Sequence, residues 1–249
     1  MTIRRHIIGN WKMHFTAAQA AEIAGALAKA KPPADVTAGV APGFLHLAQV
    51  ARALSGTPWI VGAQDCSDRP EGAATGQVAC TQIRDAGGVF AVIGHSERRQ
   101  QLKERSPLIN AKISAALEAG LVPLVCVGET GTERGAGLTV TVLDEQIRGA
   151  FLDLTPEQVG RCWIAYEPVW AIGTGQTATA EQIAAAHGHI RQQVVRGYGK
   201  PAETVPVLYG GSVSRDNSAE ILGIKEVDGL LVGGASLKAS DFTAIVGCG

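Results

Sequence analysis

Three ionisable side chains suited to proton transfer follow short apolar runs of this chain. Lys12 comes soon after one such run, His95 follows the run 90–93, and Glu167 directly follows a third. Brought together, an ammonium group, an imidazole and a carboxylate could stabilise negative charge, donate a proton and remove one. Each residue alone has a simpler interpretation, because a lysine or glutamate is most often a solvated charge. A histidine before a helix is most often a polar residue whose hydrogen bonds are satisfied by its neighbours.

Eight short apolar or β-branched runs predict the strands that must position these side chains. Their starts lie 23 to 43 residues apart, which leaves room for a helix and two loops in each interval. The predicted strands are 6–10, 36–41, 59–63, 90–93, 122–127, 162–166, 205–209 and 229–232. Some, such as 122–127, are apolar throughout, which indicates burial on both faces.

The segments between the predicted strands carry helix signals. The alanine-rich stretch 16–31 ends at Pro32, and Thr179 opens a long helix with Gln182 at capping-box spacing. Regular alternation of strands and helices predicts an α/β fold with a parallel sheet and external helices. Eight units favour an eight-stranded parallel β/α barrel over an open doubly wound sheet. Without a linker or a shift in composition, we expect a single domain over residues 1–249.

The carboxyl ends of parallel barrel strands meet on one face, where the active sites of such barrels lie. We therefore expect Lys12, His95 and Glu167 to converge there. Glycine is abundant, with 31 of 249 residues. The segments 210–212 and 233–234 place paired glycines after the last two strands, where this fold often builds a phosphate site. Two tight turns would favour glycine equally.

Two loops are unusual. The segment after Glu167 is apolar although loops normally face water, which favours a hinged lid that excludes water; a loop packed permanently on the barrel rim is the alternative. The sixteen residues 64–79 form a long predicted loop whose small residues 72–77 could insert into a partner subunit. A mobile surface loop explains the segment 64–79 equally well.

Composition and motifs disfavour several functional classes. The net charge is −1, which gives no support for a nucleic-acid or membrane partner. Without a signal peptide or a bilayer-length apolar run, and with five scattered cysteines, we expect a cytoplasmic protein with reduced thiols. The G-x-G-x-x-A pattern starting at Gly173 lies too far from its strand and lacks the acid of a dinucleotide site. For His187 and His189, packing or surface roles are expected rather than a metal site.

The motifs together resemble the triosephosphate isomerase family from the first strand to the last. They are Gly-Asn-Trp-Lys-Met at 9–13, Gly-His-Ser-Glu-Arg-Arg at 94–99, Cys-Val-Gly-Glu at 126–129, Tyr-Glu-Pro-Val-Trp-Ala-Ile-Gly-Thr-Gly at 166–175, Tyr-Gly-Gly-Ser-Val at 209–213 and Gly-Gly-Ala-Ser-Leu at 233–237. The resemblance implies the barrel fold named after this family and interconversion of dihydroxyacetone phosphate and glyceraldehyde 3-phosphate in glycolysis and gluconeogenesis. It implies neither a cofactor nor a metal. A sugar-phosphate epimerase and a catalytically dead scaffold are the rival interpretations, and neither explains the three ionisable residues together.

The resemblance also implies roles for individual residues. Glu167 would be the base, His95 a neutral electrophile, and Lys12 the charge that stabilises substrate and enediolate. Asn10 would help to hold that site, and Glu97 would be a further acid of less settled role. Phosphate would be bound by Asn10, Lys12, Gly173, Ser212, Gly233 and Gly234. The lid would comprise Pro168, Val169, Trp170, Ala171, Ile172, Gly173, Thr174, Gly175, Gln176, Thr177 and Ala178.

A homodimer formed through the loop 64–79 is implied as well, with Thr75, Gln77, His14 and Arg98 at the interface. Three residues depart from the family pattern. Gln77 replaces a glutamate that pairs with an arginine of the other subunit, and His14 replaces a common asparagine in the loop that receives the partner's Thr75. Gln176 replaces the usual lysine at the end of the lid. The first two departures bear on interface strength and the third on lid opening.

Overall fold

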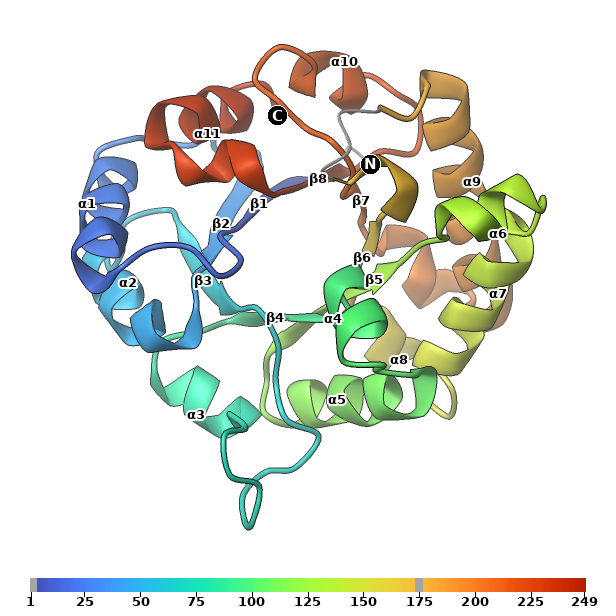
Figure 1. The fold of residues 1–249 in the computed structure, drawn as a ribbon, viewed down its shortest axis with the longest axis horizontal. Helices are drawn as coiled ribbons and strands as arrows, with labels where there is room; N and C mark the ends of the chain where they lie inside the picture. Colours follow the sequence, from blue (N-terminus) through green and yellow to red (C-terminus); the bar gives the residue numbers. More distant parts are fainter. Residues whose placement is uncertain (1–3, 173–176) are drawn as a thin grey trace.

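Eight parallel strands close into a barrel in chain order, as predicted (Figure 1). The computed structural model describes residues 4–172 and 177–249. Closure joins the first strand to the last, with His6 beside Gly229 and Gly9 beside Val232. The strands are β1 (Arg5–Asn10), β2 (Val36–Ala41), β3 (Ile60–Ala63), β4 (Phe90–Ile93), β5 (Val122–Val127), β6 (Trp163–Tyr166), β7 (Val207–Tyr209) and β8 (Gly229–Val232).

Four strands begin one or two residues away from the predicted starts. The largest difference is at β7, which was expected from residue 205. The amide of Val205 donates to the carbonyl of Ala202 in the preceding turn, and Pro206 has no N–H to donate. Neither amide therefore donates to the ladder, although the Pro206 carbonyl accepts the Ile164 amide of β6 at 2.9 Å. In the same way, the amide of Cys162 bonds to Val159 rather than to a strand, so β6 starts one residue later than predicted.

Helices surround the barrel (Figure 1). They are α1 (Ala17–Ala28), η1 (Phe44–His46), α2 (Leu47–Ala53), α3 (Cys80–Asp85), α4 (Ser96–Gln101), α5 (Ser106–Glu118), α6 (Gly131–Gly135), α7 (Thr139–Ala150), α8 (Pro156–Val159), η2 (Val169–Ala171), α9 (Ala180–Tyr198), η3 (Lys200–Thr204), α10 (Ser218–Leu222), η4 (Gly234–Leu237) and α11 (Ala239–Val246). The predicted capping box of Thr179 and Gln182 is confirmed. Helix α1 ends at Ala28, three residues before the predicted end.

The core has two layers. Inside the barrel a smaller apolar cluster includes Ile8, Phe90, Leu124 and Leu208. A larger cluster fills the space between the sheet and the helices. The Phe90 ring lies so close to β3 that a Cβ atom at Gly62 would fall 2.4 Å from it. A larger residue at position 62 would collide with the packed interior.

The segment 64–79 contains no helix or strand, as predicted, and projects away from the barrel beside α3 (Figure 1). Its base is fixed by a hydrogen bond from the Ser67 amide to the Val78 carbonyl at 2.8 Å. Near its tip, Glu71 and Thr75 are exposed. No helix in the part of the chain that the structure describes is long and apolar enough to cross a membrane.

Candidate active site

A cavity of about 390 Å³ lies at the carboxyl ends of the strands. It is lined by residues that follow five different strands, so only barrel closure brings them together. Seven of the predicted catalytic and phosphate-binding residues line it: Asn10, Lys12, His95, Glu167, Ser212, Gly233 and Gly234.

Lys12 is held in an unusual backbone conformation, with φ at +50°. Such a conformation costs energy in a residue other than glycine and persists only where neighbours enforce it. The Lys12 amide donates to the Asn10 side chain at 2.9 Å, and the Gln64 side chain donates to the Lys12 carbonyl at 2.7 Å. The Lys12 ammonium reaches Glu97, with Nζ 2.6 Å from Oε1. Asn10 and Glu97 therefore fix the two ends of the lysine.

His95 is the N-cap of α4, and its ring is bound at both nitrogens. Nδ1 accepts the backbone N–H of Glu97 at 3.3 Å, which leaves the proton of a neutral ring on Nε2. Nε2 lies 2.9 Å from Oε1 of Glu167. Burial opposes a charge on the ring, but the Glu167 carboxylate outweighs burial and raises the pKa of His95 above its ordinary value.

The Glu167 side chain is buried, with only 2% of its surface exposed. Its second oxygen accepts the backbone N–H of Ser96 at 2.9 Å, and the Ser96 hydroxyl lies 3.3 Å from the first. The interaction with the Cys126 thiol also favours the ionised carboxylate. Burial alone would raise the pKa of Glu167, but pairing with His95 and these donors lower it. The carboxylate is therefore held ionised.

Sequence reasoning missed the positioning residues Ser96 and Cys126. Both residues lie within the family motifs at 94–99 and 126–129. For Ser96, its position directly after His95 was the available sequence signal. Gly128 was missed as well: a Cβ atom there would lie 1.8 Å from the backbone oxygen of Glu167. The Glu167 amide donates to the Val127 carbonyl at 2.8 Å, which holds the Glu167 backbone against this glycine.

Ser212, Gly233 and Gly234 lie together on the side of the cavity formed after β7 and β8. Gly233 is next to the lysine, since a Cβ atom there would lie 3.6 Å from Cε of Lys12. Main chain with small side chains thus borders Lys12 in this cavity. Gly173, also predicted to bind phosphate, lies outside the described residues.

The first part of the predicted lid packs beside the base. The Trp170 indole donates to Oε1 of the buried Glu129 at 3.0 Å, and the Tyr166 hydroxyl contacts both oxygens of this carboxylate at 3.1 Å. Arg134 lies over the Trp170 ring, 4.5 Å from its centroid. Ile172 lines the cavity. The predicted lid residues 173–176 lie outside the described part of the chain, Thr177 is exposed and Ala178 is buried.

A groove of about 570 Å³ adjoins the cavity and shares Lys12 and His95 with it. His14 lines both the cavity and the groove, whereas Glu97 and Arg98 line only the groove. Arg98 is paired within its own chain, 2.8 Å from Asp65 and 2.7 Å from Glu104. The predicted interface residues Thr75 and Gln77 do not line this groove. Instead, the Ser67 hydroxyl donates to the Gln77 side chain at 2.6 Å.

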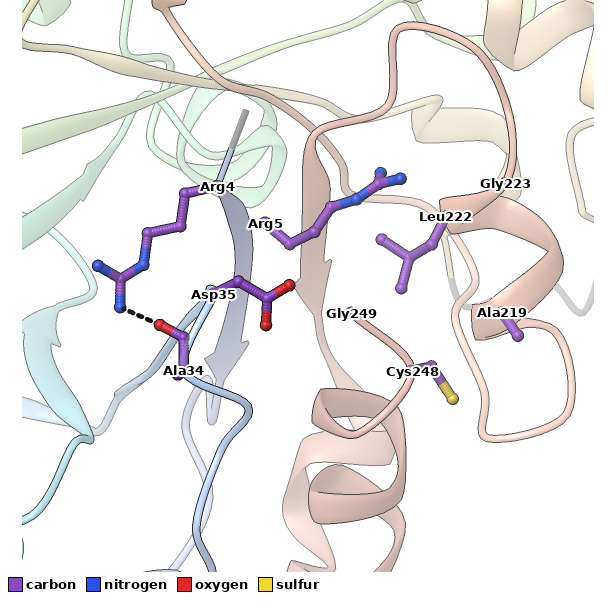
Figure 2. A pocket seen from close by; sticks show the side chains of 9 residues that line it. All are labelled: Arg4, Arg5, Ala34, Asp35, Ala219, Leu222, Gly223, Cys248 and Gly249. Atoms are coloured by element: carbon purple, nitrogen blue, oxygen red, sulfur yellow. Dashed lines mark hydrogen bonds between the residues drawn. The ribbon is translucent and has the colours of Figure 1, made fainter. Parts of the chain in front are cut away.

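A separate cavity of about 610 Å³ lies at the opposite end of the barrel (Figure 2). It is lined by Arg4, Arg5, Asp35 and the exposed Cys248, next to the amino ends of β1 and β2. The Arg4 guanidinium donates to the Ala34 carbonyl at 3.3 Å. None of the predicted catalytic residues reaches this end.

The histidine pair of α9 has structural contacts, as expected. His187 is buried, and its Nδ1 lies 3.1 Å from the Glu226 carbonyl. His189 pairs with Asp144 at 2.7 Å. Among the described residues, no group of three or more His, Cys, Asp or Glu side chains is arranged to hold a metal ion.

Comparison with known proteins gives one consistent result. The family model described as "Triosephosphate isomerase" matches residues 5–248. A protein of that name from Cupriavidus necator is 47% identical over 240 residues, which cover 96% of this chain and 97% of that protein. A second, from Jannaschia sp., is 44% identical and covers 98% and 97%. The crystal structure of triosephosphate isomerase from Bartonella henselae superposes with a TM-score of 0.88 at 37% identity, covering 98% of each chain.

Proposed function

This chain belongs to the triosephosphate isomerase family and interconverts dihydroxyacetone phosphate and glyceraldehyde 3-phosphate, and from this premise we propose how its residues perform the reaction. The reaction moves a proton between two neighbouring carbons through an enediolate. The observation that supports our assignment is the contact of the Glu167 carboxylate with Nε2 of His95 in the cavity that Lys12 also lines. The barrel that closes between β1 and β8 supports one domain over residues 1–249.

Glu167 is the base in this proposal. It removes the proton from the carbon beside the carbonyl and returns it to the neighbouring carbon. To reach substrate, the carboxylate must turn away from the Ser96 amide and from His95, which now bind both of its oxygens. Loss of these donors in a site without water makes the carboxylate more basic, because burial then acts unopposed.

His95 is the electrophile. When Glu167 turns toward substrate, the Nε2 proton becomes free to bond to the substrate oxygens. The Glu97 amide at Nδ1 keeps the ring in the tautomer that carries its proton on Nε2. An uncharged ring can then polarise the carbonyl and exchange a proton with the enediolate oxygen.

Lys12 supplies positive charge to the substrate dianion and to the enediolate. Asn10 holds the lysine backbone and Glu97 its ammonium group, so the charge is positioned before substrate enters. We place the phosphate beside Ser212, Gly233 and Gly234, where backbone can approach it closely. Gly173 would complete this site from the lid.

The lid residues 168–178 would close over the cavity. An enediolate next to a phosphate ester can expel the phosphate, so exclusion of water and a held geometry protect the intermediate. The contact of Trp170 with the buried Glu129 supports a fixed attachment at the beginning of the lid. Ile172, which already lines the cavity, would be its apolar inner face.

We also propose a cytoplasmic homodimer. The groove beside the active site exposes a set of apolar side chains, with Met13 99% and Leu45 93% exposed. The projecting loop 64–79 is a suitable occupant from a second copy, with Thr75 near its tip. Because Arg98 is neutralised by Asp65 and Glu104 in its own chain and position 77 is an uncharged glutamine, we expect apolar contact rather than an ion pair to dominate.

Turnover of glyceraldehyde 3-phosphate by the wild type and by Glu167→Asp tests the assignment of the base. The shorter side chain withdraws the carboxylate by roughly 1 Å, and such a displacement can cost about a hundredfold in rate. Glu118→Asp, at the end of α5, is the matched control and should retain full activity. Equal rates for wild type and Glu167→Asp would disprove the assignment.

A further inference from the structure

Two buried cysteines flank the loop 64–79. Cys66 lies near its beginning and Cys80 is the first residue of α3, and each is 2% exposed. Both are free thiols. Neither lines the active-site cavity, so the isomerase reaction leaves them without a role.

The base of the loop brings these thiols together. The Ser67 amide donates to the Val78 carbonyl at 2.8 Å, so the two ends of the loop run side by side. Sγ of Cys80 lies 3.7 Å from the carbonyl oxygen of Ser67, the neighbour of Cys66. Sγ of Cys66 lies 3.8 Å from the carbonyl oxygen of Lys112. The interaction with the other thiol is the largest influence on the pKa of each cysteine.

We propose that Cys66 and Cys80 are a redox-sensitive pair that forms a reversible disulfide across the base of the loop, with hydrogen peroxide as the oxidant. The proposal concerns the loop itself. It holds whether or not this loop also forms the dimer interface, so the failure of either proposal leaves the other intact.

The two sulfurs have different roles. The interaction between the two thiols lowers the pKa of Cys80 and, together with burial, raises the pKa of Cys66. Cys80 is therefore the nucleophile and Cys66 the resolving thiol. The Cys80 thiolate attacks peroxide, which breaks the O–O bond and gives a sulfenic acid and hydroxide, which is protonated to water. Cys66 then attacks the sulfenic sulfur, the S–S bond forms and a second water leaves. Two thiols lose two electrons and two protons, and one peroxide becomes two waters.

Sequence neighbours of both cysteines line a cavity. A cavity of about 260 Å³ lies beneath the loop, lined by Ser67 next to Cys66 and by Ala79 next to Cys80. Its other lining residues include the exposed Glu71 and Gly72 near the loop tip. Neither cysteine lines this cavity and each is 2% exposed, so oxidation of the pair requires local opening of the loop.

A disulfide here would restrict the loop between β3 and α3. Cross-linking removes conformational freedom from the unfolded chain. For a loop of about 15 residues in a chain of this size, we expect oxidation to raise Tm by roughly 10 °C. Dithiothreitol should reverse the rise.

The test uses the reduced full-length protein, treated with peroxide, blocked with N-ethylmaleimide, denatured and digested after glutamate. Cleavage at Glu71 separates the fragment 23–71, which contains only Cys66, from 72–97, which contains only Cys80. We expect mass spectrometry to find these fragments joined after oxidation and separate after dithiothreitol. Two unlinked, alkylated fragments under a peroxide dose that oxidises the exposed Cys248 would overturn the proposal.

Single variants then separate the two roles. Cys66→Ser should leave a sulfenic acid on Cys80 that reacts with dimedone, whereas Cys80→Ser should leave Cys66 unoxidised. Cys248→Ser is the matched control and should form the 66–80 disulfide as the wild type does. Dimedone labelling at Cys66 in Cys80→Ser, with none at Cys80 in Cys66→Ser, would refute the assigned order of attack. If either variant folds poorly, Cys→Ala at the same position replaces it, and the wild-type digest stands by itself.

Discussion

Nε2 of His95 lies 2.9 Å from Oε1 of Glu167, so the electrophile and the base that we propose are in contact before substrate enters. The contact keeps the Glu167 carboxylate ionised and raises the pKa of His95. The Glu97 amide at Nδ1 leaves the proton of the neutral ring on Nε2. Substrate must then compete with this contact. The same contact makes the titration of the two residues interdependent.

Replacing His95 should therefore move the pH profile. His95 lowers the pKa of Glu167, and without it the burial of the carboxylate raises that pKa. In His95→Gln the acid limb of kcat/KM, which reports the free enzyme, should shift to higher pH, because the base is protonated sooner as pH falls. His189→Gln is the control and should keep the wild-type limb. An acid limb that does not move in His95→Gln would contradict the coupling.

Gly128→Ala should damage catalysis from outside the cavity. The new Cβ atom would lie 1.8 Å from the Glu167 backbone oxygen, so that the backbone of the base must move. We expect a loss of about a hundredfold in kcat/KM and a destabilisation of about 1–3 kcal/mol. Gly135→Ala has nothing within 4 Å of its new Cβ atom and should be neutral or slightly stabilising. Steady-state kinetics and urea unfolding distinguish the two variants.

Met13→Asp should give a monomer if the groove receives a second copy. Met13 is 99% exposed, so the charge costs nothing in an isolated chain but would be buried in the proposed dimer. Analytical ultracentrifugation should show a dimer for the wild type and a monomer for the variant at the same concentration. Leu152→Asp places a charge on an apolar residue outside the groove and should remain dimeric. Fully active wild-type monomer at assay concentration would contradict the dimer.

His187 should make the protein less stable in acid. Burial lowers its pKa to about 4, whereas the ordinary value is 6.5. Between these values the unfolded chain binds a proton that the native protein does not, so the free energy of unfolding falls as pH falls. From pH 6.5 to 5 this histidine should account for about 2 kcal/mol.

His187→Phe removes this titration while keeping a ring against Tyr166, whose centroid lies 5.8 Å away. The variant should lose less stability than the wild type over that pH range, measured by urea unfolding at one protein concentration. His6, whose pKa burial also lowers to about 4, keeps its own share of the pH dependence. An unchanged slope in His187→Phe would rule out His187 as a source of the acid sensitivity.

The sequence by itself determined what depends on near neighbours along the chain. The capping box of Thr179 and Gln182 joins residues three apart, and the apolar runs that predict the strands need no distant partner to be recognised. The position of Lys12, His95 and Glu167 after three of these runs, together with parallel strands, was enough to predict that they share one face. Strand starts were less well predicted, because a single turn bond at Val205 decides where β7 begins.

Only the tertiary structure decided what holds these residues. The Ser96 amide and the Glu167 carboxylate are 71 residues apart in the chain, and Gly128 faces the Glu167 backbone from the neighbouring strand. Arg98 pairs with Asp65, and Sγ of Cys80 lies 3.7 Å from the Ser67 carbonyl, for the same reason. Barrel closure fixes which strand ends and loops become neighbours, and side-chain packing then selects the partner of each charge and thiol. No pattern of residue types along the chain encodes these contacts between residues that are far apart in sequence.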